Sequence, residues 1–325
     1  MAFADSANKQ AVRNAWDLPL LAAWADVTGR KLTYFGMPGP RMLDLLAWKG
    51  VLDSRRTAIE ERPKSPAKRA LADDAAAQLM HNSIKAGLSD GLQILRGDVG
   101  EIITGGLDNF AVRPLLCEAG GAAQARFRYD LHNLDFDGGL AFINKVTGEA
   151  PRLDALRKLV ERQKGASFIL FLTINVRNTV GPAIADYLER LVQMDAGGHI
   201  GWYLGRGKGE VEQRLKAIVP LLMRGVAESN GFALKCLPPL AYTGHQNARM
   251  VHFVFEFHAE DLVFAGVSKQ LVDAMLTLPM LEAVDGQIGL APLQHPACQP
   301  MESLPLLGHL EHPAATAFLS QSKAS

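Results

Sequence analysis

The chain has 325 residues, of which 48% are hydrophobic and 21% are charged, with 34 Lys and Arg residues against 34 Asp and Glu residues. This length and composition are typical of a globular protein with a sizeable core, and they exclude a mainly disordered, collagenous or coiled-coil chain. The balanced charge excludes an overall field that would draw the chain to nucleic acid or to a membrane, although a local basic face stays open.

The first half of the chain alternates short apolar runs with helical patterns. Residues 32–36 predict a strand that ends at Gly36. Pro40 then suits the first turn of a helix over residues 40–50, because the N–H that proline lacks would have no helical partner there. Further strands are predicted at residues 57–60, 92–95, 127–136 and 167–174, and further helices at residues 66–86, 153–164, 179–194 and 209–229.

The run at residues 167–174 is apolar on both faces, as in the central strand of a parallel sheet. Two strand patterns follow at residues 231–242 and 249–258, and their six-residue connection predicts an antiparallel pair. His252 and His258 share one face of the second pattern and are expected to pack. These elements predict an α/β fold with a doubly wound, Rossmann-like sheet of about seven strands, mostly parallel and closed by an antiparallel hairpin.

The length predicts about two domains, or one large α/β domain with additions. We divide the chain into a helical lead-in over residues 1–29, a Rossmann-like domain over residues 30–262 and a helical C-terminal extension over residues 263–325. The extension is expected to be an accessory cap that offers a surface to a partner protein.

The cysteines and the apolar runs bear on metal binding and location. Cys117, Cys236 and Cys298 are far apart and odd in number, so we expect reduced thiols and no metal site. The N-terminus lacks the apolar core of a signal peptide, and the longest apolar runs have about nine residues, whereas a membrane span needs about 20. We therefore expect a cytoplasmic protein without membrane contact.

Ligands of open α/β sheets bind outside the carboxyl ends of the strands. The side chains expected at that edge follow five strands, and those after the fifth strand are predicted to contact the substrate. They are Gly36, Pro38 and Gly39 after the first strand, Glu60 at the end of the second, Asp98 after the third, Asp135 and Asp137 at the fourth, and Asn175, Arg177 and Asn178 at the fifth.

A glycine turn followed about 20 residues later by an acid is typical of a site that binds a nucleotide ribose. Glu60 stands 21 positions after Gly39. Pro38 has no N–H to offer a diphosphate, and neither GxGxxG nor a Walker-type phosphate loop is present, so NAD, FAD and nicotinamide-dependent oxidation are disfavoured. S-adenosylmethionine fits, because this cationic nucleoside needs acceptors more than phosphate donors. Asp98 could accept from its adenine amino group, and Asp135 lies where the reacting methyl group would sit.

The order of these motifs resembles the class I S-adenosylmethionine-dependent methyltransferases over about residues 30–260. The segment LQILRGDVGEII is similar to the third-strand motif of that family, and YDLHNLDFDGG to its fourth-strand motif. The resemblance implies that Glu60 binds the ribose, that Asp98 binds the adenine, and that the turn from Gly36 to Gly39 lies near the methionine end.

The chain departs from the family pattern at two motifs. TYFGMPGP stands in place of the usual DxGxGxG, and the fourth motif is not the DPPY or NPPY of enzymes that methylate amino groups of nucleic acids. The chain also resembles methyltransferase-like proteins of bacterial mobile and defence gene clusters.

Methyl transfer from a sulfonium depends mainly on positioning, and a weakly nucleophilic acceptor also needs a base. We expect Asp135 or Asp137 to be that base, with His132 or His245 as alternates. A nucleic-acid acceptor could meet a basic stretch, which comprises Arg55, Arg56, Arg62, Lys64, Lys68 and Arg69.

Each site residue also has a purely structural interpretation. The glycines could only turn the chain, Glu60 could end a strand in solvent, Asp98 could cap a helix, and Asp135 with Asp137 could cap a turn. Two functions therefore stay open. One is an active methyltransferase of unknown acceptor, with a macromolecule such as nucleic acid or protein slightly favoured. The other is an inactive methyltransferase-fold subunit with a structural or sensing role in a multiprotein assembly, such as a defence system against phage.

Overall fold

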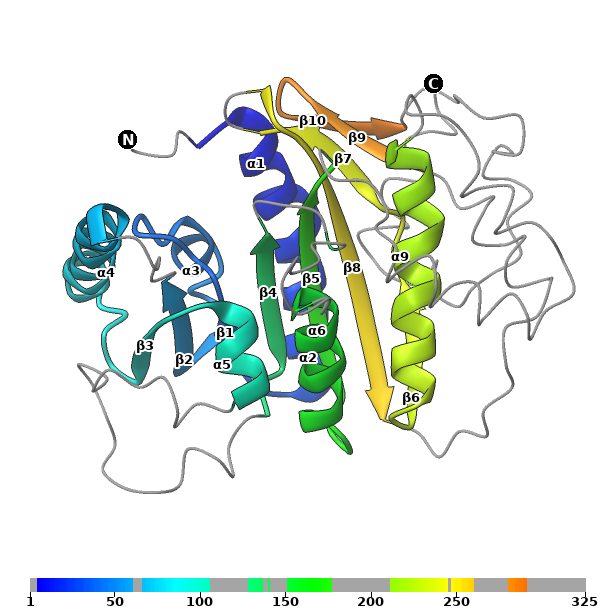
Figure 1. Ribbon diagram of the computed structural model, residues 1–325, viewed down its shortest axis with the longest axis horizontal. Coiled ribbons are helices and arrows are strands. Elements are labelled where there is room, and N and C mark those ends of the chain that lie inside the picture. Colours follow the sequence, from blue (N-terminus) through cyan, green and yellow to red (C-terminus); the bar gives the residue numbers. More distant parts are fainter. Residues whose placement is uncertain are drawn as a thin grey trace, which may run out of the picture.

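The computed structural model describes residues 5–60, 66–105, 128–136, 140, 151–176, 211–244, 247–259 and 280–290. In these residues a central sheet stands between helices on both of its faces (Figure 1). Buried hydrophobic side chains form one cluster on each face of the sheet. No helix in the described part of the chain is both long enough and apolar enough to span a membrane.

The strands of this sheet are β1 (Leu32–Gly36), β2 (Leu52–Glu60), β3 (Leu92–Arg96), β4 (Leu131–Phe136), β5 (Phe168–Asn175), β6 (Phe232–Cys236), β7 (Leu240–Thr243), β8 (Arg249–Ala259), β9 (Leu281–Val284) and β10 (Gln287–Leu290). The parallel half has the order β3-β2-β1-β4-β5, and β8 pairs antiparallel with β5. β6 and β7 both pair antiparallel with β8. This order confirms the predicted doubly wound, mostly parallel sheet with a closing antiparallel hairpin, which is the arrangement that the family resemblance implies.

The N-terminal segment is helical and packs on one face of the sheet. Trp16, Leu20 and Leu21 recur at helical spacing and are buried in the same cluster as β1 and β5 side chains. Gly29 ends the helical run in the left-handed region at φ 64°, which glycine adopts without strain. The segments are α1 (Ala7–Ala11), the π-helix η1 (Val12–Asp17) and α2 (Leu18–Thr28).

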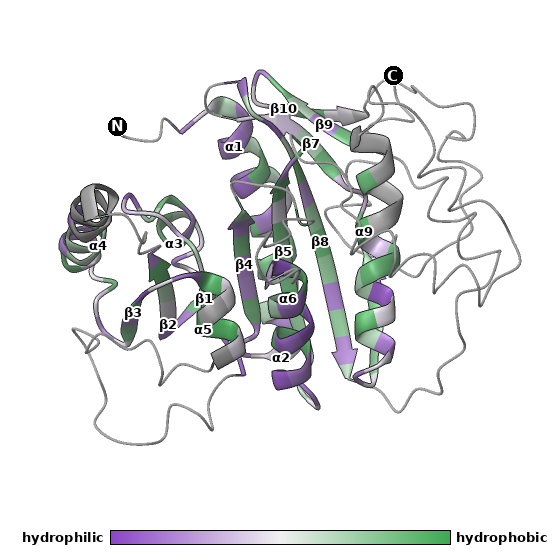
Figure 2. Ribbon diagram, viewed as in Figure 1, coloured by the Kyte–Doolittle hydropathy of each residue, from purple (hydrophilic) through white to green (hydrophobic). Residues whose placement is uncertain are grey.

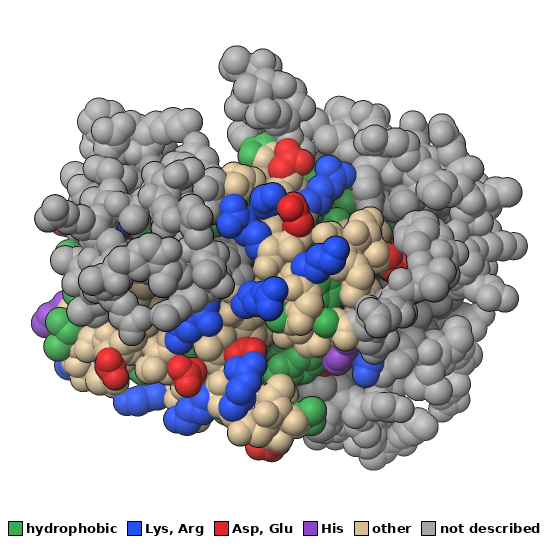
Figure 3. Space-filling view, turned by 90° about the horizontal axis from the view of Figure 1, so that it is seen from below, with side chains coloured by type: hydrophobic (Ala, Val, Ile, Leu, Met, Phe, Trp, Pro, Cys, Tyr) green, Lys and Arg blue, Asp and Glu red, His purple; other side chains and the backbone are tan. Residues whose placement is uncertain are grey.

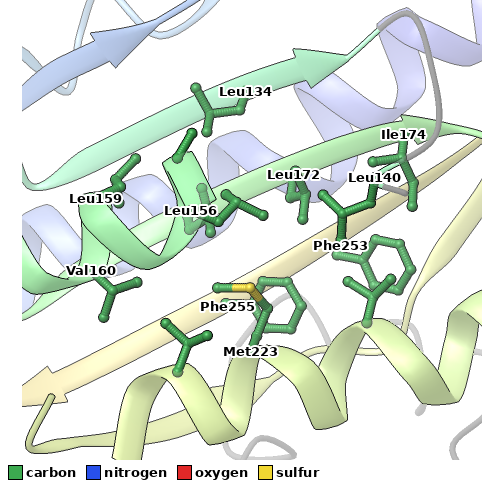
Figure 4. Packing of buried hydrophobic residues seen from close by; sticks show 14 of the residues in the cluster. Leu134, Leu140, Leu156, Leu159, Val160, Leu172, Ile174, Met223, Phe253 and Phe255 are labelled. Atoms are coloured by element: carbon green, nitrogen blue, oxygen red, sulfur yellow. The ribbon is translucent and has the colours of Figure 1, made fainter. Parts of the chain in front are cut away.

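The later helices are α3 (Leu43–Ala47), α4 (Pro66–Lys85), α5 (Val99–Gly105), α6 (Pro151–Arg162) and α9 (Val211–Glu228). α5, α6 and α9 cover the face opposite to α1 and α2 (Figure 1). Leu156 of α6 and Met223 of α9 pack over Phe253 and Phe255 of β8 (Figure 4). The helix predicted over residues 179–194 lies outside the described residues.

β5 is buried at all its positions, as expected for a central strand with apolar residues on both faces. Hydrophobic residues accordingly dominate β5 and much of β8, whereas hydrophilic residues lie along α6 and α1 (Figure 2). The fold therefore places its most hydrophobic strands in the middle and leaves polar side chains for the strand ends.

The C-terminal part differs from the sequence prediction in two ways. Residues 231–242 form two strands, β6 and β7, because the two prolines between them have no N–H with which to continue the ladder. Residues 280–290, expected to be helical, contain the hairpin of β9 and β10, which extends the sheet beyond β7. Asp285 and Gly286 join these strands with φ 49° and 80°, the type I′ geometry that favours Asp-Gly. The remainder of the predicted extension lies outside the described residues.

One member of the predicted basic stretch is not at the surface. Arg56 is buried and donates hydrogen bonds to the backbone oxygens of Asp53 and Leu88. The guanidinium carbon of Arg55 lies 4.6 Å from the centre of the Tyr129 ring. The side chains of the other four members lie outside the described residues. On the face that Figure 3 shows, which is the underside of the view in Figure 1, lysine and arginine side chains are interspersed with acidic ones.

Candidate functional site

A cavity of about 1790 Å³ lies at the carboxyl ends of the parallel strands. Of the residues predicted to bind a nucleoside, Pro38 and Gly39 after β1, Glu60 at the end of β2, Asp98 after β3 and Asp135 in β4 all line it. The strand order explains this convergence, because β3, β2, β1 and β4 are successive neighbours in the sheet and end at the same edge.

The turn after β1 begins at a position where no side chain fits. A Cβ on Gly36 would lie 2.5 Å from the backbone oxygen of Asn133 and 2.6 Å from the Tyr34 hydroxyl. The following N–H, from Met37, donates to the same Asn133 oxygen at 3.0 Å. Gly36 itself does not line the cavity, so its absent side chain lets β1 and β4 close together and thereby sets the path of the turn.

Gly36→Ala is expected to destabilise the protein by about 1–3 kcal/mol, because the backbone oxygen of Asn133 must shift to admit the new methyl group. Gly39→Ala is the matched control. A Cβ there meets no atom within 4 Å, so only the strain of φ 64° is added, about 1 kcal/mol. Urea unfolding monitored by circular dichroism measures both changes, and equal losses of stability would contradict this account of β1 and β4.

Glu60 combines burial with an unused acceptor. Its carboxylate oxygen Oε1 is buried and makes no hydrogen bond to any residue that the structure describes. Burial raises the pKa of the Glu60 carboxyl to about 7. A buried acid that lacks a protein donor is costly to keep, and donors from a ligand, such as two ribose hydroxyls, would satisfy it.

Asp98 lines the cavity and also begins a helix. Its backbone oxygen accepts the hydrogen bond of Ile102, and its Oδ1 lies 3.0 Å from where a Cβ on Gly100 would stand. The carboxylate is thus turned back over the first turn of α5, as in the helix-capping interpretation. The side chain is nevertheless exposed at the cavity, so an adenine contact stays a prediction.

Asp135 meets a cation that sequence reasoning missed. The Lys9 ammonium of α1 lies 3.0 Å from its Oδ2, and each of these side chains is about one third exposed. α1 therefore reaches over the edge of β4 and partly neutralises the acid that the sequence predicts as cofactor ligand and base. The catalytic role of Asp135 stays a prediction.

Other predicted residues do not meet at the cavity. His132 is fully buried among the rings of Phe35, Tyr129 and Phe168, and burial lowers its pKa to about 3. It is therefore placed in the core and not as an alternate base. Asn175 is also buried and is not part of the cavity lining. The positions Asp137, Arg177, Asn178 and His245 lie outside the described residues.

A second polar network at the cavity joins the N-terminal helices to the strand edge. The Arg13 Nε donates to Asp44 Oδ1 at 2.6 Å, and Asn133 Nδ2 donates to Asp44 Oδ2 at 2.9 Å. Arg13 also pairs with Asp5 at 3.1 Å. The helical pattern over residues 40–50 places Asp44 on a helix, but no local pattern in the sequence indicates that Arg13 would reach it.

Three polar side chains stand in one row across the sheet. Asp135 of β4 is in register with Thr173 of β5, and Thr173 is in register with His252 of β8. Residues in register on adjacent strands point to the same face, so this row faces the N-terminal helices and lines the cavity. His252, expected to be a packing residue, is therefore a cavity residue. No local pattern in the sequence distinguishes it from His258 on the same strand face.

No family model matches the sequence, and no curated protein matches it. Among solved structures, cofactor-bound Rv0187 from MTB is similar with a TM-score of 0.39 and 12% identity, over 76% of this chain and 81% of that one. The O-methyltransferase TomG from Streptomyces achromogenes, in complex with SAM, has a TM-score of 0.37 and 11% identity, over 80% and 93% of the two chains. The O-methyltransferase from Bacillus cereus, in complex with SAH, has a TM-score of 0.37 and 12% identity, over 79% and 93%. Similarity at these values is too distant to transfer a role to any residue.

Proposed function

We propose that the protein is an S-adenosylmethionine-dependent methyltransferase that binds this nucleoside in the cavity at the ends of β1 to β4. The observation that carries the proposal is Glu60, a half-buried acid that lines the cavity together with Asp98 and the Gly39 turn and whose buried Oε1 accepts no hydrogen bond from the described residues. Along the edge, Asp98 after β3, Glu60 of β2 and the Gly39 turn after β1 follow one another. With the roles that the family resemblance implies, this is the order adenine, ribose and methionine, in which these parts are connected in S-adenosylmethionine.

The charge and surface of the cavity fit the proposed cofactor. Among the residues that the structure describes, seven acidic and five basic side chains line it, so their net charge favours a cationic ligand. Ile59 and Val99, the sequence neighbours of Glu60 and Asp98, also line the cavity and provide apolar surface, which suits a flat purine ring. Pro38 removes one N–H from the turn, which disfavours a diphosphate there. When bound, S-adenosylmethionine would supply an electrophilic methyl group, and the chain would supply binding, orientation and exclusion of water.

The proposal is tested by isothermal titration of the full chain with S-adenosylmethionine and with S-adenosylhomocysteine. Saturable binding of both is expected, whereas NAD should not bind. Absence of binding at millimolar concentrations of both adenosyl compounds would contradict the proposal. Binding without transfer of a labelled methyl group to nucleic-acid, protein or small-molecule fractions of a cell extract would favour the inactive subunit.

A further inference from the structure

Three side chains from three separate elements form a buried hydrogen-bonded chain at one end of the cavity. His252 Nε2 lies 2.9 Å from Asp17 Oδ1, and His252 Nδ1 lies 2.9 Å from Thr173 Oγ1. Asp17 is 3% exposed, His252 3% and Thr173 5%, yet all three contribute to the cavity lining.

The polarity of this chain follows from its acid. An ionised Asp17 can only accept, so it takes the Nε2–H of His252, and Nδ1 is left to accept the hydrogen of the Thr173 hydroxyl. The oxygen of Thr173 then has lone pairs available for a hydroxyl donor. The chain is arranged to receive a proton at Thr173 and to hold it on His252 beside a carboxylate.

Charged groups from every neighbouring element surround the chain. Asp17 comes from η1, the Lys9–Asp135 ion pair joins α1 to β4, and the Arg13–Asp44 ion pair joins η1 to α3. The ion pairs are internally compensated, so Asp17 is the anion in direct contact with the imidazole. Burial raises the pKa of Asp17, while its charge interaction and hydrogen bond with His252 oppose that shift.

We propose that Asp17, His252 and Thr173 form a proton relay that activates a hydroxyl acceptor, so that the enzyme is an O-methyltransferase. This inference rests on the proposed function. Thr173 of β5 is in register with Asp135 of β4, and His252 of β8 with Thr173. The relay therefore lies beyond Gly39, Glu60 and Asp98 at the ends of β1 to β3, on the side of the cavity left for the acceptor.

The proposed step balances as follows. The acceptor O–H gives its proton to Thr173 Oγ1 while the Thr173 hydroxyl proton passes to His252 Nδ1, and the resulting imidazolium is stabilised by Asp17. The acceptor oxygen forms a bond to the methyl carbon of S-adenosylmethionine, whose carbon–sulfur bond breaks to release S-adenosylhomocysteine. His252 later loses the proton to solvent. A hydroxyl needs this help because its oxygen is a weak nucleophile, whereas a neutral amine already has an available lone pair.

The test uses para-nitrophenol as a hydroxyl probe whose ionised form absorbs visible light. The probe is titrated into the full chain saturated with S-adenosylhomocysteine, and the pKa of the bound probe is read from a pH series. In the unaltered protein the relay should lower that pKa by about one unit or more. Thr173→Val should abolish the shift and Thr173→Ser should restore it, while binding of S-adenosylhomocysteine stays unchanged in both.

His252→Phe should also abolish the shift, and His258→Phe is its matched control. His258 lies on the same strand, pairs with Glu256 at 3.2 Å and is not part of the cavity lining. If His252→Phe fails to fold, the Thr173 pair of variants decides. The relay would be overturned if the probe does not bind or if the pKa of the bound probe is unshifted. It would also be overturned if the shift survives Thr173→Val but is lost in Lys9→Met.

The relay and the proposed function fail in different ways. Loss of S-adenosylhomocysteine binding in the unaltered protein overturns both. Normal binding of S-adenosylhomocysteine with an unshifted probe overturns the relay alone and leaves the methyltransferase proposal standing.

Discussion

Phe171→Ala is expected to destabilise the protein by about 3–5 kcal/mol, the cost of emptying the place of a fully buried aromatic ring. Phe171 has 0% exposure in the middle of β5. The centre of its ring lies 5.6 Å from that of Trp48 and 5.6 Å from that of His252. The ring therefore joins three parts of the molecule: β5, β8 and the segment after α3. It lies on the same face of β5 as Thr173 of the polar row, two residues away along the strand.

The loss is measured by urea unfolding with circular dichroism and tryptophan fluorescence. Val27→Ala is the control, because Val27 is 88% exposed near the end of α2 and its replacement should change stability by no more than about 0.5 kcal/mol. A loss below about 1 kcal/mol for Phe171→Ala would show that the packing between the sheet and the N-terminal helices is looser than the structure indicates.

Glu60→Ala is expected to weaken the binding of S-adenosylhomocysteine by about 1–3 kcal/mol, or about 5- to 150-fold, through loss of hydrogen bonds to a buried carboxylate. Isothermal titration measures this change. Glu161→Ala is the matched control, because Glu161 is an exposed acid that pairs with Lys158 on α6 and does not line the cavity. Equal affinity of Glu60→Ala and the unaltered protein would remove Glu60 from the site even if the fold is right.

The raised pKa of Glu60 also predicts how the binding of S-adenosylhomocysteine depends on pH. Because the pKa of Glu60 in the free protein is raised to about 7, the acid is largely protonated below that pH. Ribose hydroxyls donate to the ionised form, so affinity should fall as the pH is lowered through about 7 and should level off above it. Glu60→Gln keeps the size of the side chain without the titration, and its affinity should be independent of pH in this range.

Local patterns in the sequence were sufficient for most of the sheet. The continuous apolar run of β5 and the glycine turn after β1 report how their own residues are buried or bent, and both predictions are confirmed. β8 is a strand, as predicted, but it is buried on both faces although polar side chains alternate with apolar ones along it. The same patterns placed Glu60, Asp98 and Asp135 at successive strand ends, and parallel neighbours bring such ends together. The hairpin at Asp285 and Gly286 was missed although Asp-Gly is its usual signal.

The sequence by itself thus determined the alternation of strands and helices and the acids at one edge of the sheet, because both depend on short-range periodicity. Only the tertiary structure decided which groups those acids meet. Asp17 and His252 are 235 residues apart, and Lys9 and Asp135 are 126 apart. Such pairs form because the N-terminal helices bury their apolar side on the sheet, and neither partner carries a local pattern that reports the other.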